Sequence, residues 1–272
     1  MTEVIEPRDG VVAFAGDWHG ETSWAMTVIE QVAERTDVLL HVGDFGIWPG
    51  NYGARYLHKV NRTCGQHGVR ILITPGNHED WARLLKRWAN PKLHAEDGSL
   101  LPIPLTDHVS VLPRGYRWQM TADAGRAVSF VSLGGAPSVD FEHRTKGRSW
   151  WPEEMMTEAD VDLVASGGYA DVMVTHDAPG PPYACRKVVE ILDTNPLGWS
   201  DTALAYATVG RERVTRAFEA VAPRLSVHGH YHVSDETTVR VAGVDHDSEV
   251  WSLAAHRMAG NWRTLDLATM AH

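Results

Sequence analysis

Cysteine is scarce in this chain of 272 residues, which contains only Cys64 and Cys185. The two cysteines lie far apart and outside any C-x-x-C spacing, so the sequence offers neither a disulfide framework nor a thiolate zinc site. A reducing compartment fits this composition.

Long apolar runs are also missing, because no stretch of about 18 apolar residues occurs. The N-terminal segment is polar and carries Glu3, Glu6, Arg8 and Asp9 instead of a basic region followed by an apolar run. We therefore expect a cytoplasmic protein that does not enter a membrane.

Positively charged residues are also few, since the chain has 25 Lys and Arg residues and 35 Asp and Glu residues, which gives a formal net charge of −10. A chain of this kind has no overall basic field that would draw it onto extended nucleic acid or an anionic membrane. An anionic substrate must therefore meet local positive charge, supplied either by bound metal ions or by a small group of arginines.

The chain does contain a repeated unit of apolar strand, polar turn and helix. Strands are predicted at 11–15, 37–42, 69–74, 109–112, 116–120, 128–133, 171–175 and 224–227. Helical spacing covers 21–36, 52–66, 153–166 and about 184–222. This alternation predicts βαβ units and a largely parallel sheet, whose ligand sites collect beyond the carboxyl ends of the strands. The last part of the chain alternates like antiparallel strands, at 237–241, 250–253 and 262–267.

The length and a hydrophobic content of 43% are sufficient for one large core, and no linker or internal repeat divides the chain. We predict a single domain over residues 1–272. Two irregular segments, at about 90–106 and 138–152, are expected to be excursions from its surface.

Metal-binding residue types recur at the predicted strand ends. Asp17 and His19 are two residues apart, as are His230 and His232. In extended backbone such residues point the same way, so each pair can reach one ion. Carboxylate oxygen and imidazole nitrogen suit zinc, manganese or iron. Other strand ends carry the further candidates Asp44, Asn77 and His176.

A structural role is the alternative for each of these residues taken singly. Asp and Asn often cap helices and close turns, so capping is the better interpretation of Asp44 or Asn77 alone. A core histidine can be satisfied without metal, and His41 and His228, which lie inside the predicted strands, are expected to be of that kind. The recurrence of the whole set at strand ends favours a metal site.

The motifs, as a set, resemble the calcineurin-like metallophosphoesterase superfamily, and especially its bacterial and phage members. They occur in that family's order, as Gly16-Asp17-x-His19, Gly43-Asp44, Gly76-Asn77-His78-Glu79, His176 and Gly229-His230-x-His232. The resemblance implies an α/β fold, a four-layer α/β/β/α sandwich in which two mixed sheets pack face to face with helices outside.

A dinuclear metal centre is also implied by the resemblance. The first ion would be held by Asp17, His19 and His232, and the second by Asn77, His176 and His230. Asp44 would bridge the two ions. Two divalent cations are expected. Manganese is the first choice, with iron, zinc, nickel and cobalt as alternatives, because oxygen and nitrogen ligands accept all of these metals.

The activity implied is hydrolysis of a nucleotide or cyclic-nucleotide phosphodiester by in-line attack of a hydroxide that bridges the two ions. His78 resembles the family's histidine that protonates the leaving alkoxide. A nuclease, a nucleotide pyrophosphatase and a phosphomonoesterase are alternatives within the superfamily. A non-catalytic metal-binding scaffold is the alternative from another class of protein.

The chain departs from the family pattern at Ile47. The second motif commonly reads G-D-x-x-D, and its later aspartate orients the catalytic histidine, whereas position 47 here is isoleucine. Either another group orients His78, with Asp80, Asp177 and a backbone carbonyl as the candidates, or no group does. The region also lacks the arginine that follows this motif in protein serine/threonine phosphatases and diadenosine tetraphosphatases, which argues against those activities.

A dense basic patch lies in the segment 138–152, where Arg144 stands near His143, Lys146 and Arg148. We expect Arg144 to contact a substrate phosphate and the neighbouring tryptophans to stack on a base. The alternative is a surface loop anchored by buried tryptophans. The expected partner is a small phosphorylated substrate such as a nucleotide, and the oligomeric state is left open.

Overall fold

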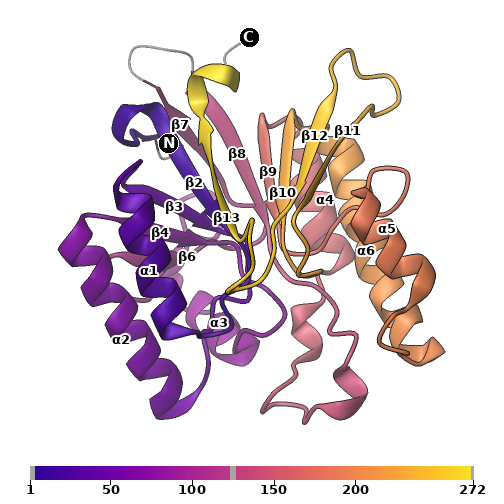
Figure 1. Ribbon diagram of the computed structural model, residues 1–272, viewed down its shortest axis with the longest axis horizontal. Coiled ribbons are helices and arrows are strands. Elements are labelled where there is room, and N and C mark those ends of the chain that lie inside the picture. Colours follow the sequence, from indigo (N-terminus) through magenta and orange to yellow (C-terminus); the bar gives the residue numbers. More distant parts are fainter. Residues whose placement is uncertain (1–3, 123–126, 271–272) are drawn as a thin grey trace.

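The computed structural model describes residues 4–122 and 127–270. Residues 1–3, 123–126 and 271–272, which fall inside the predicted domain, lie outside the described residues. Two β-sheets face each other in the middle of the molecule, and helices cover the outer face of each (Figure 1). The predicted four-layer α/β/β/α sandwich is confirmed.

The first sheet has six strands in the order β13-β2-β3-β4-β6-β5. Its parallel centre consists of β2 (Val11–Ala15), β3 (Val38–His41), β4 (Arg70–Ile73) and β6 (Val109–Val111). The antiparallel edge strands are β5 (Ile103–Pro104) and β13 (Trp262–Asp266). The helices that follow the first strands are α1 (Thr22–Ala33), α2 (Gly50–His67) and α3 (Trp81–Trp88).

The second sheet has seven strands in the order β1-β7-β8-β9-β10-β12-β11. Its parallel centre consists of β8 (Ala127–Leu133), β9 (Val172–Thr175), β10 (Leu225–His228) and β12 (Ser248–Ser252). The remaining strands are β1 (Val4–Ile5), β7 (Arg117–Thr121) and β11 (Asp235–Val239). The outer helices are α4 (Glu158–Ser166), α5 (Arg186–Thr194) and α6 (Asp201–Val221). Antiparallel pairs β7–β8 and β11–β12 make this sheet mixed, as predicted.

Alternate residues of the central strands enter different cores. In β2, Val12 and Phe14 belong to the core between the sheets, whereas Ala13 and Ala15 pack in the core beneath the outer helices. Because both faces of these strands are buried, they appear in the sequence as continuous apolar runs. The two sheets are thereby packed into one body, which fixes the carboxyl ends of their strands relative to one another.

Two of the predicted helices differ from the observed ones. The helix expected over 153–166 begins only at Glu158, because Thr157 caps it and a 3-10 turn, Pro152–Glu154, comes first. The helical region expected at 184–222 is two helices. Asn195, in the left-handed region at φ 41°, ends α5, and the Ser200 hydroxyl caps α6.

The prediction for the last strands was wrong in part. The strand expected at 250–253 is β12, which pairs in parallel with β10 and antiparallel only with β11. A local pattern shows alternation but does not identify the neighbour, so it could not distinguish the two pairings. The short strand β1, which pairs in parallel with β7, was not predicted.

The two irregular segments are held to the body of the molecule. In 90–106, a 3-10 turn (Pro91–Leu93) and a bridge between His94 and Leu100 precede the edge strand β5. In 138–152, a 3-10 turn (Phe141–His143) is followed by the buried Trp151. Two further 3-10 turns span Arg8–Gly10 and Leu267–Met270.

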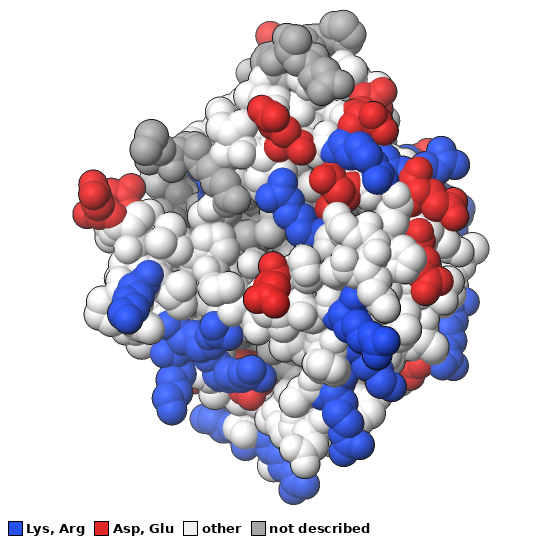
Figure 2. Space-filling model, turned by 90° about the vertical axis from the view of Figure 1, so that its left-hand side faces the viewer, with Lys and Arg blue, Asp and Glu red and all other residues white. Residues whose placement is uncertain are grey.

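Charged side chains of both signs share the surface. Figure 2 shows the side on which α1 and α2 lie, where Lys and Arg side chains are interspersed with Asp and Glu side chains and with uncharged surface. In the described part of the chain, no helix has both the length and the apolar character needed to cross a bilayer.

Candidate metal centre

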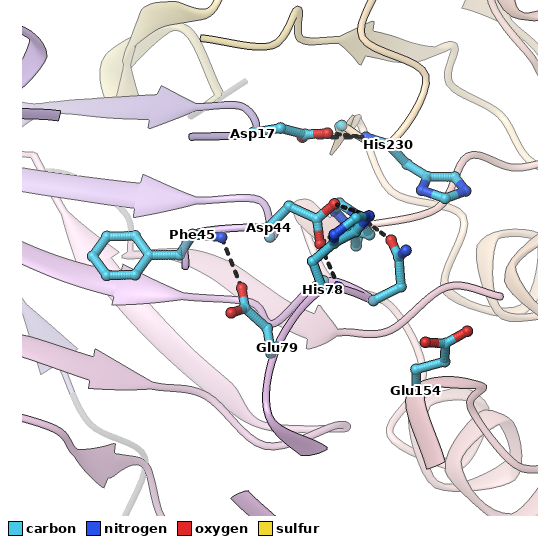
Figure 3. A network of polar contacts seen from close by, with 12 residues as sticks. Asp17, Asp44, Phe45, His78, Glu79, Glu154 and His230 are labelled. Atoms are coloured by element: carbon cyan, nitrogen blue, oxygen red, sulfur yellow. Dashed lines mark hydrogen bonds and ion pairs between the residues drawn. The ribbon is translucent and has the colours of Figure 1, made fainter. Parts of the chain in front are cut away.

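The eight residues predicted as ligands or as the proton donor meet at one edge of the sandwich. Each follows the carboxyl end of a strand. The first sheet contributes Asp17 and His19 after β2, Asp44 after β3, and Asn77 and His78 after β4, and the second contributes His176 after β9 and His230 and His232 after β10. Figure 3 shows Asp17, Asp44, His78 and His230 approaching one another from separate strand ends.

Asp44 lies at the centre of this cluster. Its carboxylate oxygens are 3.4 Å from His19 Nε2 and 3.4 Å from His176 Nε2. Three groups of side chains place their ligand atoms within 4.8 Å of one another, and each group could hold a metal ion. The first group is Asp17, His19 and His232; the second is His19, Asp44 and His78; the third is Asp17, Asp44 and His176. The groups share members, as a site for two neighbouring ions requires.

Asn77 and His230 complete the cluster on the side of His176. Asn77 Oδ1 is 2.9 Å from His176 Nε2, and the ring of His230 lies 5.1 Å from that of His176, measured between centroids. The backbone N–H of His230 donates to the carboxylate of Asp17 at 3.2 Å. The amide oxygen and both imidazoles therefore face the same space.

The backbone is strained at four of these residues. His19, Asp44, His230 and His232 have φ of 46°, 52°, 68° and 57°, in the left-handed region that non-glycine residues rarely adopt. Each such residue costs about 1–3 kcal/mol unless its surroundings impose the conformation. Four such residues in one cluster of side chains that could hold metal ions indicate that the fold imposes unfavourable backbone conformations to place these side chains.

Glycines give the two carboxylates room. A Cβ on Gly76 would lie 2.2 Å from Asp44 Oδ1, and a Cβ on Gly229 would lie 2.2 Å from Asp17 Oδ1. Any larger residue at either position would push a carboxylate out of the cluster. The glycines that precede Asn77 and His230 in the sequence motifs thus have a packing role.

The electrostatics of the cluster favour bound positive charge. Burial alone would raise the pKa of Asp17, but the hydrogen bond with His232 and the charge of His176 lower it to about 2. Asp44 behaves in the same way and has a pKa well below its ordinary value. Burial opposes the charge on His176, yet the neighbouring carboxylates, Asp44 first, raise its pKa to about 10. Without metal the cluster therefore retains a proton, which is the behaviour expected of a cation site.

The ring of His78 is half-buried beside this cluster, with Nε2 3.8 Å from Asp44 Oδ2. The same ring nitrogen lies 2.6 Å from Arg144 Nη2, and Arg144 Nε is 2.7 Å from Asp140 Oδ1. Burial lowers the pKa of His78, and the charge of Arg144 lowers it further, while Asp44 raises it. The predicted substrate contact Arg144 is thus next to the predicted proton donor.

The two carboxylates considered for orienting His78 lie elsewhere. Asp80 accepts a hydrogen bond from the backbone N–H of Arg83 and caps α3. Asp177 accepts from the hydroxyl of Tyr231 at 3.1 Å and from the N–H of Ala178. In the described residues, the polar side chains around the His78 ring are the guanidinium of Arg144, held by Asp140, the carboxylate of Asp44 at 3.8 Å from Nε2 and the ring of His19 at 5.1 Å between centroids.

Glu79 holds the loop in which Ile47 replaces the family's aspartate. Its buried carboxylate accepts hydrogen bonds from the backbone N–H groups of Phe45, Gly46 and Ile47 at 2.7, 3.4 and 2.8 Å. Figure 3 shows this carboxylate turned toward Phe45. Burial raises the pKa of Glu79 to about 7, and the charge of Asp44 adds to the shift. Ile47 itself packs in the core beneath the outer helices.

Ser138 and Glu154 extend the cluster and were not predicted. Asn77 Nδ2 donates to Ser138 Oγ at 2.8 Å, and Glu154 accepts from the N–H and hydroxyl of Ser138 at 2.5 and 2.9 Å. All three side chains are buried. Glutamate is mostly a surface residue, so nothing in the sequence around Glu154 signals an inward position.

His41 and His228, expected to need no metal, are buried inside β3 and β10. Burial lowers their pKa values to about 3 and about 4, so both rings are neutral. Neither belongs to a group of described residues that could hold an ion.

Comparison with solved structures finds distant similarities. A hypothetical protein from Thermus thermophilus is 14% identical over 90% of this chain and 75% of its own, with a TM-score of 0.39. A predicted phosphoesterase from Streptococcus pneumoniae is 8% identical over 94% of this chain and 83% of its own, with a TM-score of 0.34. The purple acid phosphatase PPD1 of yellow lupin (Lupinus luteus) is 11% identical over 89% of this chain and 43% of its own, with a TM-score of 0.43.

No curated protein matches the sequence. The model of one family, described as calcineurin-like phosphoesterase, matches residues 10–234 and so spans every strand end that carries the cluster. The chain belongs to the calcineurin-like phosphoesterase family.

Proposed function

We propose that the protein is a phosphodiesterase that depends on two divalent metal ions and acts on a nucleotide or cyclic-nucleotide phosphodiester. The observation that carries this proposal is the cluster around Asp44, where three overlapping ligand groups lie beside the half-buried ring of His78. Family membership supports the coarser statement, a metal-dependent phosphoester hydrolase.

The ligands proposed for the two ions fit the geometry of the cluster. Asp17, His19 and His232 form one group of ligand atoms. Asn77, His176 and His230 surround the neighbouring space, and Asp44 reaches both. When bound, divalent ions supply positive charge to phosphate oxygens and lower the pKa of water between them. Manganese is the metal we propose, since all the donor atoms are oxygen or nitrogen.

His78 is proposed to donate a proton to the leaving oxygen as the P–O bond breaks. Its ring is at the rim of the cluster and partly exposed, so a substrate oxygen can reach it. A proton donor matters most when the leaving group is a poor alkoxide, which is the situation in alkyl diesters. Arg144, whose guanidinium adjoins the same ring, is proposed to contact the substrate phosphate.

The nuclease alternative has less support. The formal net charge is −10, and on the face shown in Figure 2 the basic side chains are interspersed with acidic ones. A protein that tracks a nucleic-acid backbone usually carries a continuous basic stripe. A pyrophosphatase or monoesterase would use the same site, whereas a scaffold without catalysis would not need His78 beside the cluster.

The test is hydrolysis of bis-p-nitrophenyl phosphate and of p-nitrophenyl phosphate with added Mn²⁺, by the parent and by Asp44→Ala and His78→Ala. We expect diester turnover that needs metal. His78→Ala should lower the turnover of a diester with an alkoxide leaving group, such as a cyclic nucleotide, by about 10²–10⁴-fold, the usual contribution of a general acid, and that of the nitrophenyl ester by less, because nitrophenolate leaves without a proton. Asp44→Ala should abolish turnover and reduce the number of ions bound.

Matched controls are Asp162→Ala and His58→Ala, which remove the same side chains from exposed helical positions. Both controls should retain full activity. Preference for the monoester would contradict the diesterase assignment. No turnover of either ester by folded, metal-loaded parent would contradict the enzyme and favour the scaffold.

A further inference from the structure

A cavity of about 380 Å³ is lined by His78 and by none of the seven residues predicted as metal ligands. Its walls include Trp48, His78, Arg144, Arg148, Ser149 and Trp151. A larger cavity of about 540 Å³ lies beside α6, but its Arg213 and Arg216 are already paired with Glu158. The smaller cavity is thus the one that combines the proposed proton donor with arginines.

The two arginines of this cavity are bound differently. Arg144 is fixed by Asp140, by the backbone oxygen of Ser149 at 3.2 Å and by the ring of His78. Arg148 is exposed, and no carboxylate in residues 4–122 or 127–270 forms an ion pair with it. Its backbone is nevertheless held, because its N–H donates to Thr145. Arg148 therefore offers a guanidinium without an ion-pair partner among the described residues, carried by a backbone that is held in place.

The rest of the wall is aromatic and firmly placed. Trp48 Nε1 donates to the backbone oxygen of His78 at 3.1 Å, and its ring is stacked with Tyr52 at 5.5 Å between centroids. Trp151 is only 5% exposed. The two tryptophans give the cavity apolar surface beside its arginines, and such surface reduces the screening of a guanidinium by water on that side.

The position of His78 indicates that the cavity receives the leaving group of the substrate. The proposed proton transfer ends on the leaving oxygen, so that oxygen must lie at the His78 ring. The reacting phosphate would lie at the cluster around Asp44, so the group attached to the leaving oxygen must extend from the His78 ring away from the ligands. The cavity adjoins that ring and is lined by none of the ligands, so it can receive this group.

We propose that the cavity binds the leaving group of the substrate, and that this leaving group carries its own anionic oxygens, as a phosphate or carboxylate, which Arg148 binds. The inference rests on the proposed function and names the substrate class within it: small diesters or phosphoanhydrides whose leaving group is itself charged. The volume of about 380 Å³ fits such a group, because small-molecule sites usually measure about 300–1,000 Å³.

The test compares two chromogenic diesters that differ in the charge of the leaving group, methyl 4-nitrophenyl phosphate and methyl 3-carboxy-4-nitrophenyl phosphate. The parent, Arg148→Ala and Lys146→Ala are assayed with Mn²⁺. Lys146 is an exposed cation in the same segment that does not line the cavity, so it controls for the loss of one charge. We expect the parent to hydrolyse the carboxylated ester with kcat/KM about tenfold higher, the size of one charge-assisted contact.

Arg148→Ala should abolish this preference by raising the KM for the carboxylated ester, while the kinetics of the uncharged ester stay the same. Lys146→Ala should hydrolyse the two esters with the same preference as the parent. Equal kcat/KM for the two esters in the parent would overturn the cavity assignment alone. So would an equal loss of the preference in Arg148→Ala and Lys146→Ala, since it would show a general charge effect. No metal-dependent turnover of either ester would overturn the proposed function and the cavity assignment with it.

Discussion

At the scale of single residues, the orientation of Asn77 is set by a chain of hydrogen bonds. The Ser138 hydroxyl donates to Glu154 Oε2, so its lone pairs are free to accept from Asn77 Nδ2. The amide oxygen of Asn77 must then point the other way, toward His176. Glu154, two contacts from the cluster, thereby selects the oxygen of Asn77 as the atom presented to an ion.

Removing the Ser138 hydroxyl should weaken one of the two metal sites. Ser138→Ala leaves the Asn77 amide without an acceptor and free to rotate, and loss of such a support usually costs about 10–100-fold in metal affinity. Titration calorimetry with Mn²⁺ should show one site weakened by this factor and the other unchanged. Ser166→Ala, which removes an exposed hydroxyl from α4, is the control. Two sites of parental affinity in Ser138→Ala would show that the network does not position Asn77.

The ligand candidates could be predicted from the sequence because each stands directly after an apolar run. Because the strand ends of parallel sheets meet at one edge, we expected Asp17 and His232 to lie together although they are far apart in the sequence. His232 Nε2 is 3.0 Å from Asp17 Oδ2. The contact of Arg144 with His78 could not be predicted, because it depends on how 138–152 folds back across the edge. The same is true of Ser138 and Glu154.

At the scale of elements, the loop after β3 depends on Glu79 for its shape. Three backbone N–H groups of residues 45–47 donate to this one buried carboxylate. The loop also carries the strained Asp44 at its start, so its position decides where the central carboxylate of the cluster lies. A side chain that follows β4 thus fixes the turn that follows β3.

Glu79→Ala should lower the free energy of unfolding of the metal-free protein by about 3 kcal/mol or more, because each buried N–H left without an acceptor costs about 1–3 kcal/mol. Glu79→Gln keeps one carbonyl acceptor and should lose less. Urea denaturation measures both values. Glu30→Ala, on the exposed face of α1, is the control and should change stability by less than about 0.5 kcal/mol. An unfolding free energy of Glu79→Ala equal to that of the control would contradict this role.

The order of the elements followed from local patterns, whereas some of their limits and pairings did not. Apolar runs such as 11–15 and 171–175 correspond to β2 and β9 within one residue. The start of α4 depends on a side-chain cap, and the neighbours of β12 depend on tertiary packing. The spacing of apolar residues and the amino-acid composition do not reveal where a side chain caps a helix or which strand pairs with which.

At the scale of the whole molecule, the cluster joins the two sheets. Asp17, Asp44 and Asn77 extend from strands of the first sheet, and His176 and His230 from strands of the second. An ion held by ligands of both sheets binds the folded protein and has no comparable site in the unfolded chain. Its binding free energy therefore adds to the stability of the fold.

The stabilisation by metal should increase with pH, because the metal-free protein loses stability as His176 titrates whereas the metal-loaded protein, which carries no proton there, does not. The pKa of His176 is raised from 6.5 to about 10, so its contribution to metal-free stability is full below pH 6.5 and is lost as pH rises through the folded pKa. Metal binding requires that proton to leave, so it strengthens over the same range. Asp17, with a pKa of about 2, stays ionised over this range, so it adds no pH dependence to the stability.

The difference in Tm between protein in Mn²⁺ and protein in EDTA should therefore widen steadily between about pH 6.5 and about pH 8.5. Scanning calorimetry at constant ionic strength measures this difference. A difference that stays constant would mean that His176 gives up no proton on binding, and so that it does not bind the ion.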